Sequence, residues 1–322
     1  MRVRDLDEAE LLARVLPLLP TRALLGPGDD AAVVAAPDAR VVATTDVLVE
    51  GRDFRRDWSS GADVGWKAVA QNVADVAAMG ATCSGLLLAL GLPGDLGVAW
   101  VEDFAAGAAE ACRALGAVVV GGDLSGAGEV VVAVTALGDL AGRAPVLRSG
   151  ARPGDVVALT GRPGRSAAGL DLLRAGRLEG PAPVADLLAA HRRPVPPVSL
   201  GPAAAAAGAS ALMDVSDGLL RDAGRIAAAS GVRLDLHVAG TALGESAAAL
   251  AAATGAGADV AGAWVLTGGE DHGLLACFPP GVEPPEGFRA VGRVGPAGEH
   301  PVLVDGRPWS GPGLGWDHFR RG

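Results

Sequence analysis

Residues 66–80 read Trp-Lys-Ala-Val-Ala-Gln-Asn-Val-Ala-Asp-Val-Ala-Ala-Met-Gly and carry the clearest structural signal in the chain. Apolar residues recur there with helical spacing and Gly80 ends the pattern, which predicts a helix over residues 62–79. Four polar side chains adjoin one another on that helix: Lys67, Gln71, Asn72 and Asp75. The surrounding Ala and Val indicate a buried face, and a buried carboxylate needs a cation, a metal or several donors. We therefore interpret Asn72 and Asp75 as site residues.

Strand-like and helix-like segments alternate on both sides of this helix, without the fixed period of a repeat array. Helices are expected at residues 5–19, 62–79, 98–115, 166–174, 184–191, 199–208 and 218–230, and strands at 39–44, 84–91, 117–120, 129–137, 155–160, 211–213, 233–238, 274–278, 289–294 and 301–304. Residues 138–154 are rich in Gly, Pro and Arg, so we place a domain boundary near residue 145, between domains 1–145 and 146–322. The mixture predicts an α+β or α/β class without a dinucleotide-binding signature.

The composition excludes several classes of function. The chain has 322 residues, 27 basic against 37 acidic, and a net charge of −10, which argues against a nucleic-acid partner. The single lysine, Lys67, follows Trp66 and not Gly, so a P-loop and a protein-kinase site are both excluded. If the protein handles nucleotides, something other than lysine neutralises the phosphates.

The cysteines and the N-terminal residues predict a cytoplasmic protein. Cys83, Cys112 and Cys277 are far apart, form no CxxC and adjoin small or apolar residues, as buried thiols in a reducing compartment do. Residues 1–20 mix acids with leucines and lack the basic start of a signal peptide. No apolar run reaches 18 residues without Gly, Pro or charge, so no membrane span is expected.

Further acidic clusters end short apolar segments beside Gly, Ser or Thr. They are Gly28-Asp29-Asp30-Ala31, Thr44-Thr45-Asp46, Gly121-Gly122-Asp123, Asp214-Val215-Ser216-Asp217-Gly218 and Thr267-Gly268-Gly269-Glu270-Asp271. Adjacent carboxylates repel each other unless a cation binds, and we expect Thr44 and Asp46 to emerge together at the carboxyl end of a strand. Each cluster also has a plain structural interpretation, as a solvated turn or a helix cap. Taken together, the carboxylates favour several magnesium ions that bridge a polyphosphate.

Eight motifs in order make the chain resemble the thiamine-monophosphate kinase family, whose superfamily includes aminoimidazole ribonucleotide synthetase and selenophosphate synthetase. The resemblance covers Gly26 to the C-terminus. The motifs are GDDAAV from Gly28, TTDVLVEGRDF from Thr44, KAVAQNVADVAAMGA from Lys67, GGD from Gly121, LRSGARPGD from Leu147, DVSDGL from Asp214, GGEDHGLL from Gly268 and GWDHF from Gly315. Each motif alone is weak, but the ordered set is highly specific.

The resemblance implies an α+β, two-domain fold like that of aminoimidazole ribonucleotide synthetase. Its N-terminal mixed sheet with helices would bind ATP and magnesium and form a homodimer, and its C-terminal α/β sandwich would complete the ATP and substrate sites. The implied reaction is in-line transfer of the γ-phosphoryl group of ATP to thiamine monophosphate, with Mg²⁺ and no dedicated general base. Whether K⁺ is also required, and how many metals bind, is left open.

The resemblance also assigns residues motif by motif. The implied metal ligands are Asp30, Thr44, Thr45, Asp46, Asp75, Asp123, Asp214 and Asp217. The implied ATP contacts are Gly122, Asp123, Arg148 and Ser216. The implied substrate contacts are Asp53, Glu270 and Trp316, with the Trp ring stacked on the cationic heterocycle of thiamine.

Two departures separate this chain from the family pattern. The family commonly has His where Asp53 stands, and an acid there would repel a substrate phosphate unless a metal, Arg52 or Arg55 compensates. The family's GGEDYELL reads GGEDHGLL here, and we expect His272 and Gly273 to alter packing more than chemistry.

Other interpretations stay open. Selenophosphate synthetase would need a reactive Cys near the N-terminus, but the first Cys is Cys83, and aminoimidazole ribonucleotide synthetase would carry its own motifs in place of GGED and GWDHF. A catalytically silent ATP-binding regulator, with Asp53 marking a lost substrate site, is an alternative of another class. Lys67 is interpreted as a structural counter-charge to Asn72 and Asp75.

Overall fold

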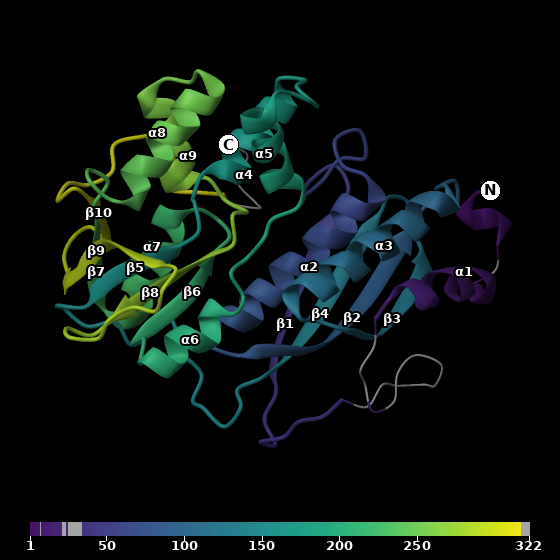
Figure 1. Cartoon of the computed structure of the whole chain (residues 1–322), viewed down its shortest axis with the longest axis horizontal. Coiled ribbons are helices and arrows are strands. Elements are labelled where there is room, and N and C mark those ends of the chain that lie inside the picture. Colours follow the sequence, from purple (N-terminus) through teal and green to yellow (C-terminus); the bar gives the residue numbers. More distant parts are fainter. Residues whose placement is uncertain (7, 21–23, 25–33, 317–322) are drawn as a thin grey trace. The chain divides into compact units, whose positions relative to one another are not determined.

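The computed structural model describes residues 1–6, 8–20, 24 and 34–316, and two compact units account for them. The first unit comprises Met1–Val76 and Ala81–Gly142, and the second Ala77–Gly80 and Arg143–Gly322 (Figure 1). Asp30, an implied metal ligand, lies outside the described residues.

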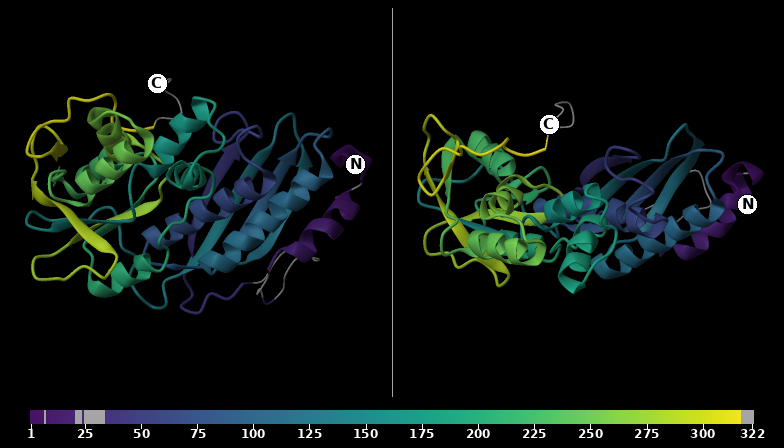
Figure 2. Two further views of the ribbon diagram at one scale, coloured as in Figure 1. Left: turned by 45° about the horizontal axis from the view of Figure 1, so that its top comes forward. Right: turned by 90° about the horizontal axis from the view of Figure 1, so that it is seen from above.

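The first unit is a four-stranded mixed sheet with helices on one face (Figures 1 and 2). The strand order is β1-β4-β2-β3; β4 is antiparallel to β1 and β2, and β2 is parallel to β3. The strands are β1 (Val42–Val49), β2 (Thr82–Leu92), β3 (Val119–Gly126) and β4 (Val131–Asp139). The helices are α1 (Glu8–Val15), α2 (Gly61–Ala78), α3 (Val98–Leu115) and the short 3₁₀ turns η1 (Val3–Asp5) and η2 (Leu16–Leu18).

Glycines let α2 and α3 pack backbone against backbone. A Cβ atom on Gly65 would lie 2.1 Å from the Phe104 carbonyl oxygen, and one on Gly107 would lie 2.0 Å from that of Ala62. Gly116 ends α3 with φ +73°, the left-handed conformation that a glycine cap adopts without strain. The bounds of α3 and its cap are those expected from the sequence.

Two strands of this unit are longer than the sequence indicated, which corrects the position of two motifs. Thr44 and Asp46 lie in the middle of β1 and not at its end, because Val47–Val49 continue to pair with β4. The Gly121-Gly122-Asp123 motif lies within β3, paired in parallel with β2. Asp and Gly are depleted in strands, but the pairing of neighbouring strands overrides that preference here.

The second unit is built on a six-stranded sheet of order β10-β7-β9-β5-β8-β6, antiparallel except between β10 and β7. The strands are β5 (Val156–Thr160), β6 (Ala211–Val215), β7 (Val232–Leu236), β8 (Gly273–Phe278), β9 (Phe288–Pro296) and β10 (Val302–Val304). The helices are α4 (Arg165–Arg174), α5 (Ala182–Arg192), α6 (Leu200–Ala207), α7 (Leu219–Ser230), α8 (Ala242–Thr254) and α9 (Ala258–Thr267). The two-sheet, mixed helix and strand architecture confirms the expected fold class.

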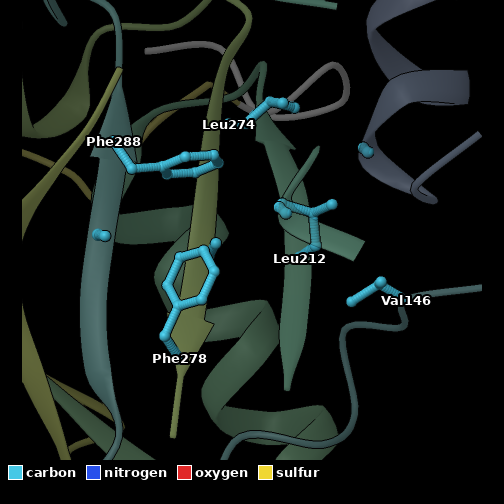
Figure 3. Packing of buried hydrophobic residues seen from close by; sticks show 9 residues of the cluster. Val146, Leu212, Leu274, Phe278 and Phe288 are labelled. Carbon is cyan, nitrogen blue, oxygen red and sulfur yellow. The ribbon is translucent and has the colours of Figure 1, made fainter. Parts of the chain in front are cut away.

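A buried apolar cluster joins the strands of this sheet to α6 (Figure 3). Leu212, Leu274 and Phe278 form its centre, and the Phe278 and Phe288 rings meet edge to face at 5.4 Å between centroids. Aromatic pairs prefer this geometry because the positive ring edge meets the negative face of the partner.

The sequence analysis missed α8 and α9. Their segments are rich in Ala and Gly, so no clear apolar periodicity marks them in the sequence. The helices form because Leu243, Leu250, Val265 and Leu266 are buried within the second unit, and tertiary packing supplies most of a helix's stability. In the described part of the chain, no helix combines the length and apolar character needed to cross a membrane.

Candidate active-site residues

The polar face of α2 is buried, as its sequence predicted. Lys67 is only 3% exposed and Asn72 is fully buried. The Asn72 amide nitrogen donates to the Ala68 carbonyl at 2.9 Å, whereas its Oδ1 has no hydrogen-bond partner among the described residues. Burying an acceptor without a donor is costly, so this oxygen is available to a cation or a donor that the described chain does not supply.

Asp75 is joined to the central residues of β1. The Thr44 hydroxyl donates to Asp75 Oδ2 at 2.9 Å. Asp46 follows Thr44 by two residues, and side chains two apart in a strand point to the same face. The structure therefore brings Thr44 and Asp75 into contact and places Asp46 on the same face of the sheet.

Thr45 and Asp123 lie on the opposite face. The Thr45 hydroxyl donates to the Val134 carbonyl at 2.9 Å, within the sheet. The register passes from Val47 through β4 and β2 to Asp123, so the Asp123 side chain shares the face of Thr45 and Val47. Within one chain, Thr45 and Asp123 therefore lie on the face of the sheet opposite to Asp75 and its partner Thr44.

Gly122 and Asp53 have structural roles in the first unit. A Cβ on Gly122 would lie 2.0 Å from the Leu88 carbonyl oxygen, so β3 needs glycine there to pair with β2. Asp53 Oδ2 accepts the Val49 backbone N–H at 2.8 Å and so holds the turn after β1. Arg55, one of the expected compensating charges, is paired with Asp57 at 2.6 Å and lies over the Trp58 ring at 4.5 Å.

In the second unit, implied substrate and ATP residues converge on the turn between β6 and α7. The Glu270 N–H donates to the Ser216 carbonyl at 2.8 Å, and the Trp316 N–H donates to the Asp217 carbonyl at 2.7 Å. Gly218 adopts φ +118°, and a Cβ there would lie 2.5 Å from the Thr267 carbonyl oxygen. Three motifs far apart in sequence therefore meet at one turn.

The Asp217 carboxylate is held by a cation that the sequence analysis did not identify. Arg225 contacts Asp217 Oδ2 at 2.5 Å and Asp222 Oδ1 at 2.6 Å. Asp222 is fully buried and also accepts the Asp217 N–H at 3.1 Å. Burial raises the pKa of Asp222 to about 7, although Arg225 opposes the shift. A metal at Asp217 therefore competes with Arg225 for Oδ2.

His272 contacts Asp214 directly, and the expectation that this substitution alters packing more than chemistry stays a prediction. Its Nδ1 lies 3.3 Å from Asp214 Oδ2, and both side chains are buried. His272 also adopts φ +51°, and its N–H donates to the Val215 carbonyl at 3.1 Å. The tyrosine of the family pattern has no ring nitrogen, so only its hydroxyl could donate to a carboxylate.

Arg148 is anchored through its backbone, with an exposed side chain. Its carbonyl accepts the Ser230 hydroxyl at 3.0 Å, and the preceding Leu147 carbonyl accepts the Leu212 N–H at 3.1 Å. The loop that presents the guanidinium is thus fixed to β6 and to the end of α7.

Within the ranges that the structure describes, no three His, Cys, Asp or Glu side chains lie close enough to hold a metal ion. Magnesium does not require such a cage, since it is usually bound by one or two carboxylates, substrate phosphates and water. The unpaired Asn72 Oδ1 and the separate carboxylates of both units are oxygen donors of the type that Mg²⁺ prefers.

Comparison with known proteins identifies the family. The family model described as "AIR synthase related protein, N-terminal domain" matches residues 28–140. The thiamine-monophosphate kinase of Mycobacterium tuberculosis is 50% identical over 302 residues, which cover 93% of this chain and 87% of that protein. The chain belongs to the thiamine-monophosphate kinase family. The resemblance found in the eight motifs is thereby confirmed.

Solved structures of the thiamine-monophosphate kinase family share the fold. The complex of AaThiL with AMPPCP and TMP has a TM-score of 0.80 and 34% identity, and the match covers 99% of each chain. The thiamine-monophosphate kinase of Aquifex aeolicus is 35% identical in sequence over 320 residues, 99% of this chain and all of that protein. The hydrogenase maturation protein HypE, at 19% identity and a TM-score of 0.71, shares the fold alone.

Proposed function

We propose that this chain transfers the γ-phosphoryl group of ATP to thiamine monophosphate and so forms thiamine diphosphate. Family membership supports this activity. The structural observation that carries it is the convergence of Glu270 and Trp316 on the Ser216 and Asp217 carbonyls. Residues expected to contact thiamine are thus held on the turn expected to contact ATP and metal.

Trp316 and Glu270 suit the thiamine end of the substrate. Thiamine carries a positively charged ring, and an aromatic face attracts a cation through its quadrupole. The Trp316 side chain is 46% exposed and so presents its ring to a ligand, while Glu270 adds a carboxylate beside the same turn. Together they select a cationic heterocycle over a neutral one.

Magnesium is the expected cofactor, and the oxygen donors present fit it. In the first unit Thr44, Asp46 and Asp75 would hold it, and in the second unit Asp214 and Asp217. When bound, Mg²⁺ offsets the charge on the phosphates during transfer. Arg148 is expected to contact ATP from the loop before β5. Thr45 and Asp123 remain implied ligands that the geometry of one chain does not join to these groups, and Asp30 lies outside the described residues.

The chain's own residues align the reactants, and none is needed as a base. The phosphate of thiamine monophosphate is already anionic at neutral pH, so it is a nucleophile without proton removal. Alignment of the attacking oxygen with the γ-phosphorus supplies the entropic part of the acceleration. Rigid anchoring of Glu270 and Trp316 on one turn serves this alignment.

We also propose a homodimer that forms through the open face of the first unit's sheet. In the described residues, helices cover only the opposite face (Figure 2). Val47 is 50% exposed on the open face, and Leu87 and Thr45 share that face with it. Pairing of two such faces would bury them. The three buried, unbonded cysteines support a cytoplasmic location.

The activity is tested by incubating purified protein with ATP, Mg²⁺ and thiamine monophosphate and quantifying thiamine diphosphate. We expect product only with all three, and none with AMPPCP in place of ATP. The same assay with Na⁺ in place of K⁺ decides whether K⁺ is required. Tight ATP binding with no product would favour the silent regulator instead.

A further inference from the structure

His191 makes a contact that the proposed chemistry does not use. Its Nδ1 lies 3.2 Å from Glu270 Oε2, and its side chain is buried at the end of α5. The Ser166 hydroxyl lies 3.0 Å from the same nitrogen. None of the sequence motifs included His191 or Ser166.

The protonation of Nδ1 decides whether the contact between His191 and Glu270 is attractive. An ionised carboxylate only accepts hydrogen bonds, so the contact is attractive when Nδ1 carries the proton. His191 then donates to Glu270, and the Ser166 oxygen lies beside the same N–H. This arrangement orients a carboxylate that is about one-third exposed.

His191 is itself held in place by close packing of α4 and α5. A Cβ on Gly169 of α4 would lie 2.1 Å from the Leu187 carbonyl oxygen and 3.1 Å from the His191 Cβ. The glycine therefore allows the two helices to approach at the position of His191. This close approach fixes the backbone position from which the imidazole reaches Glu270.

The neighbouring Asp271 ties the same loop to α4. Asp271 accepts the Gly164 N–H at 2.6 Å and the Ser166 N–H at 2.8 Å, which caps the start of the helix. The path from Glu270 through Asp271, Ser166 and His191 returns to Glu270 as a closed ring of contacts. Glu270 adopts φ +63°, a conformation uncommon for a non-glycine residue, which such fixed surroundings can maintain.

We infer that His191 is a positioning residue, which orients the Glu270 carboxylate toward the cationic ring of thiamine monophosphate. This inference rests on the proposed function. It assigns His191 a role in selecting the thiamine end of the substrate and none in binding ATP. Loss of the His191 N–H donor should therefore raise the KM for thiamine monophosphate and leave the KM for ATP unchanged.

The test compares two replacements of His191. His191→Leu removes the donor but keeps a branched side chain, whereas His191→Asn keeps an N–H close to the position of Nδ1. We expect His191→Leu to raise the KM for thiamine monophosphate about tenfold, as for loss of one charge-assisted hydrogen bond, with the KM for ATP unchanged. His191→Asn should restore most of the wild-type value. Asp186→Ala, an exposed change on the same helix, is the control.

The outcomes distinguish failure of the positioning role of His191 from failure of the proposed kinase activity. The positioning role is overturned if His191→Leu leaves the KM for thiamine monophosphate unchanged, or if it raises the KM for ATP in parallel. It is also overturned if His191→Leu and His191→Asn raise the KM for thiamine monophosphate equally. In each of these cases, activity of the wild-type protein still upholds the proposed function. An inactive wild-type protein overturns both. If His191→Leu does not fold, His191→Met, which also lacks a hydrogen-bond donor, takes its place with the same expectations.

Discussion

Asp75 and Asp217 are both implied magnesium ligands, but different partners hold their carboxylates. Asp75 accepts a neutral hydroxyl from Thr44, whereas Asp217 is paired with the guanidinium of Arg225. Because Arg225 already compensates the charge of Asp217, a metal ion at Asp217 must compete with this guanidinium.

The first prediction concerns this group. Asp75→Asn, and likewise Asp46→Asn, should lower turnover more than about tenfold, roughly 1.4 kcal/mol of barrier, because each removes a negative oxygen donor. Turnover is measured at limiting and at saturating Mg²⁺, with the exposed Asp95→Asn as control. Wild-type turnover of Asp75→Asn at limiting Mg²⁺ would remove it from the set of ligands.

The second prediction concerns the pH dependence of stability through Asp222. Its pKa is about 7 in the folded protein, against about 3.9 in an unfolded chain, so the folded state binds more protons between these values. Its stabilising contribution is complete below pH 4 and is lost as the pH rises through about 7. Relative to Asp222→Asn, the wild-type free energy of unfolding should fall by roughly 2 to 3 kcal/mol between about pH 5 and 8.

Urea unfolding of both proteins with EDTA present measures this difference. The prediction is contradicted if the free energy of unfolding of the wild type, relative to that of Asp222→Asn, stays constant or rises with pH. Arg225 would then compensate the buried charge of Asp222 fully. EDTA is needed because Asp217, next to Asp222, is an implied metal ligand.

Some candidate site residues could be predicted from the sequence, and others could not. Asn72 and Asp75 were predictable because polar residues interrupt an apolar helical pattern. His191 and Arg225 were not, because their roles depend on partners that only the fold brings near them. His272 was noticed as a departure from the family, but its contact with Asp214 crosses from β6 to the loop before β8.

The helices of the first unit depend on glycine where their backbones touch. Gly65 of α2 faces the Phe104 carbonyl of α3 so closely that even a methyl group has no room. The α2 segment carries Asp75, so the position of this carboxylate depends on that helix contact.

The third prediction follows from this packing. Gly65→Ala should destabilise the protein by about 2 to 3 kcal/mol, because α2 and α3 must separate to admit the new methyl group. The gain in helix propensity, up to about 1 kcal/mol, is too small to offset the clash. Thermal unfolding is compared with Gly128→Ala, where an added Cβ meets no atom within 4 Å. Equal melting temperatures for the two variants would contradict the packing.

Element prediction succeeded where local signals and tertiary structure agree. The bounds of α3 followed from its apolar spacing and its Gly116 cap. The strands β1 and β3 were predicted too short, because Asp46 and Gly121 look like strand ends until the partner strand is known. The helices α8 and α9 were missed because an Ala-rich composition hides the apolar face that packing selects.

The described helices of the first unit cover one face of its sheet and leave the other face open (Figure 1). The open side carries small and apolar residues of β1, β4 and β2, including Val47 and Leu87. An exposed apolar sheet face is a common interface between subunits. The proposed homodimer accounts for this face at the scale of the whole molecule.

The fourth prediction tests the dimer. Wild-type protein should have twice the 31.9 kDa chain mass by light scattering, and Val47→Arg should shift it toward the monomer, because it buries a charge without a partner. Val195→Arg, at an exposed position in the second unit, should remain dimeric. A monomeric wild-type protein would exclude the proposed assembly.

The proposed reaction moves one phosphoryl group from ATP to thiamine monophosphate. The most direct measurement is the ratio of ADP to thiamine diphosphate formed in one reaction with Mg²⁺. We predict one ADP for each thiamine diphosphate, and no ADP above background when thiamine monophosphate is omitted. ADP formed without thiamine diphosphate, or no reaction despite ATP binding, would contradict the account.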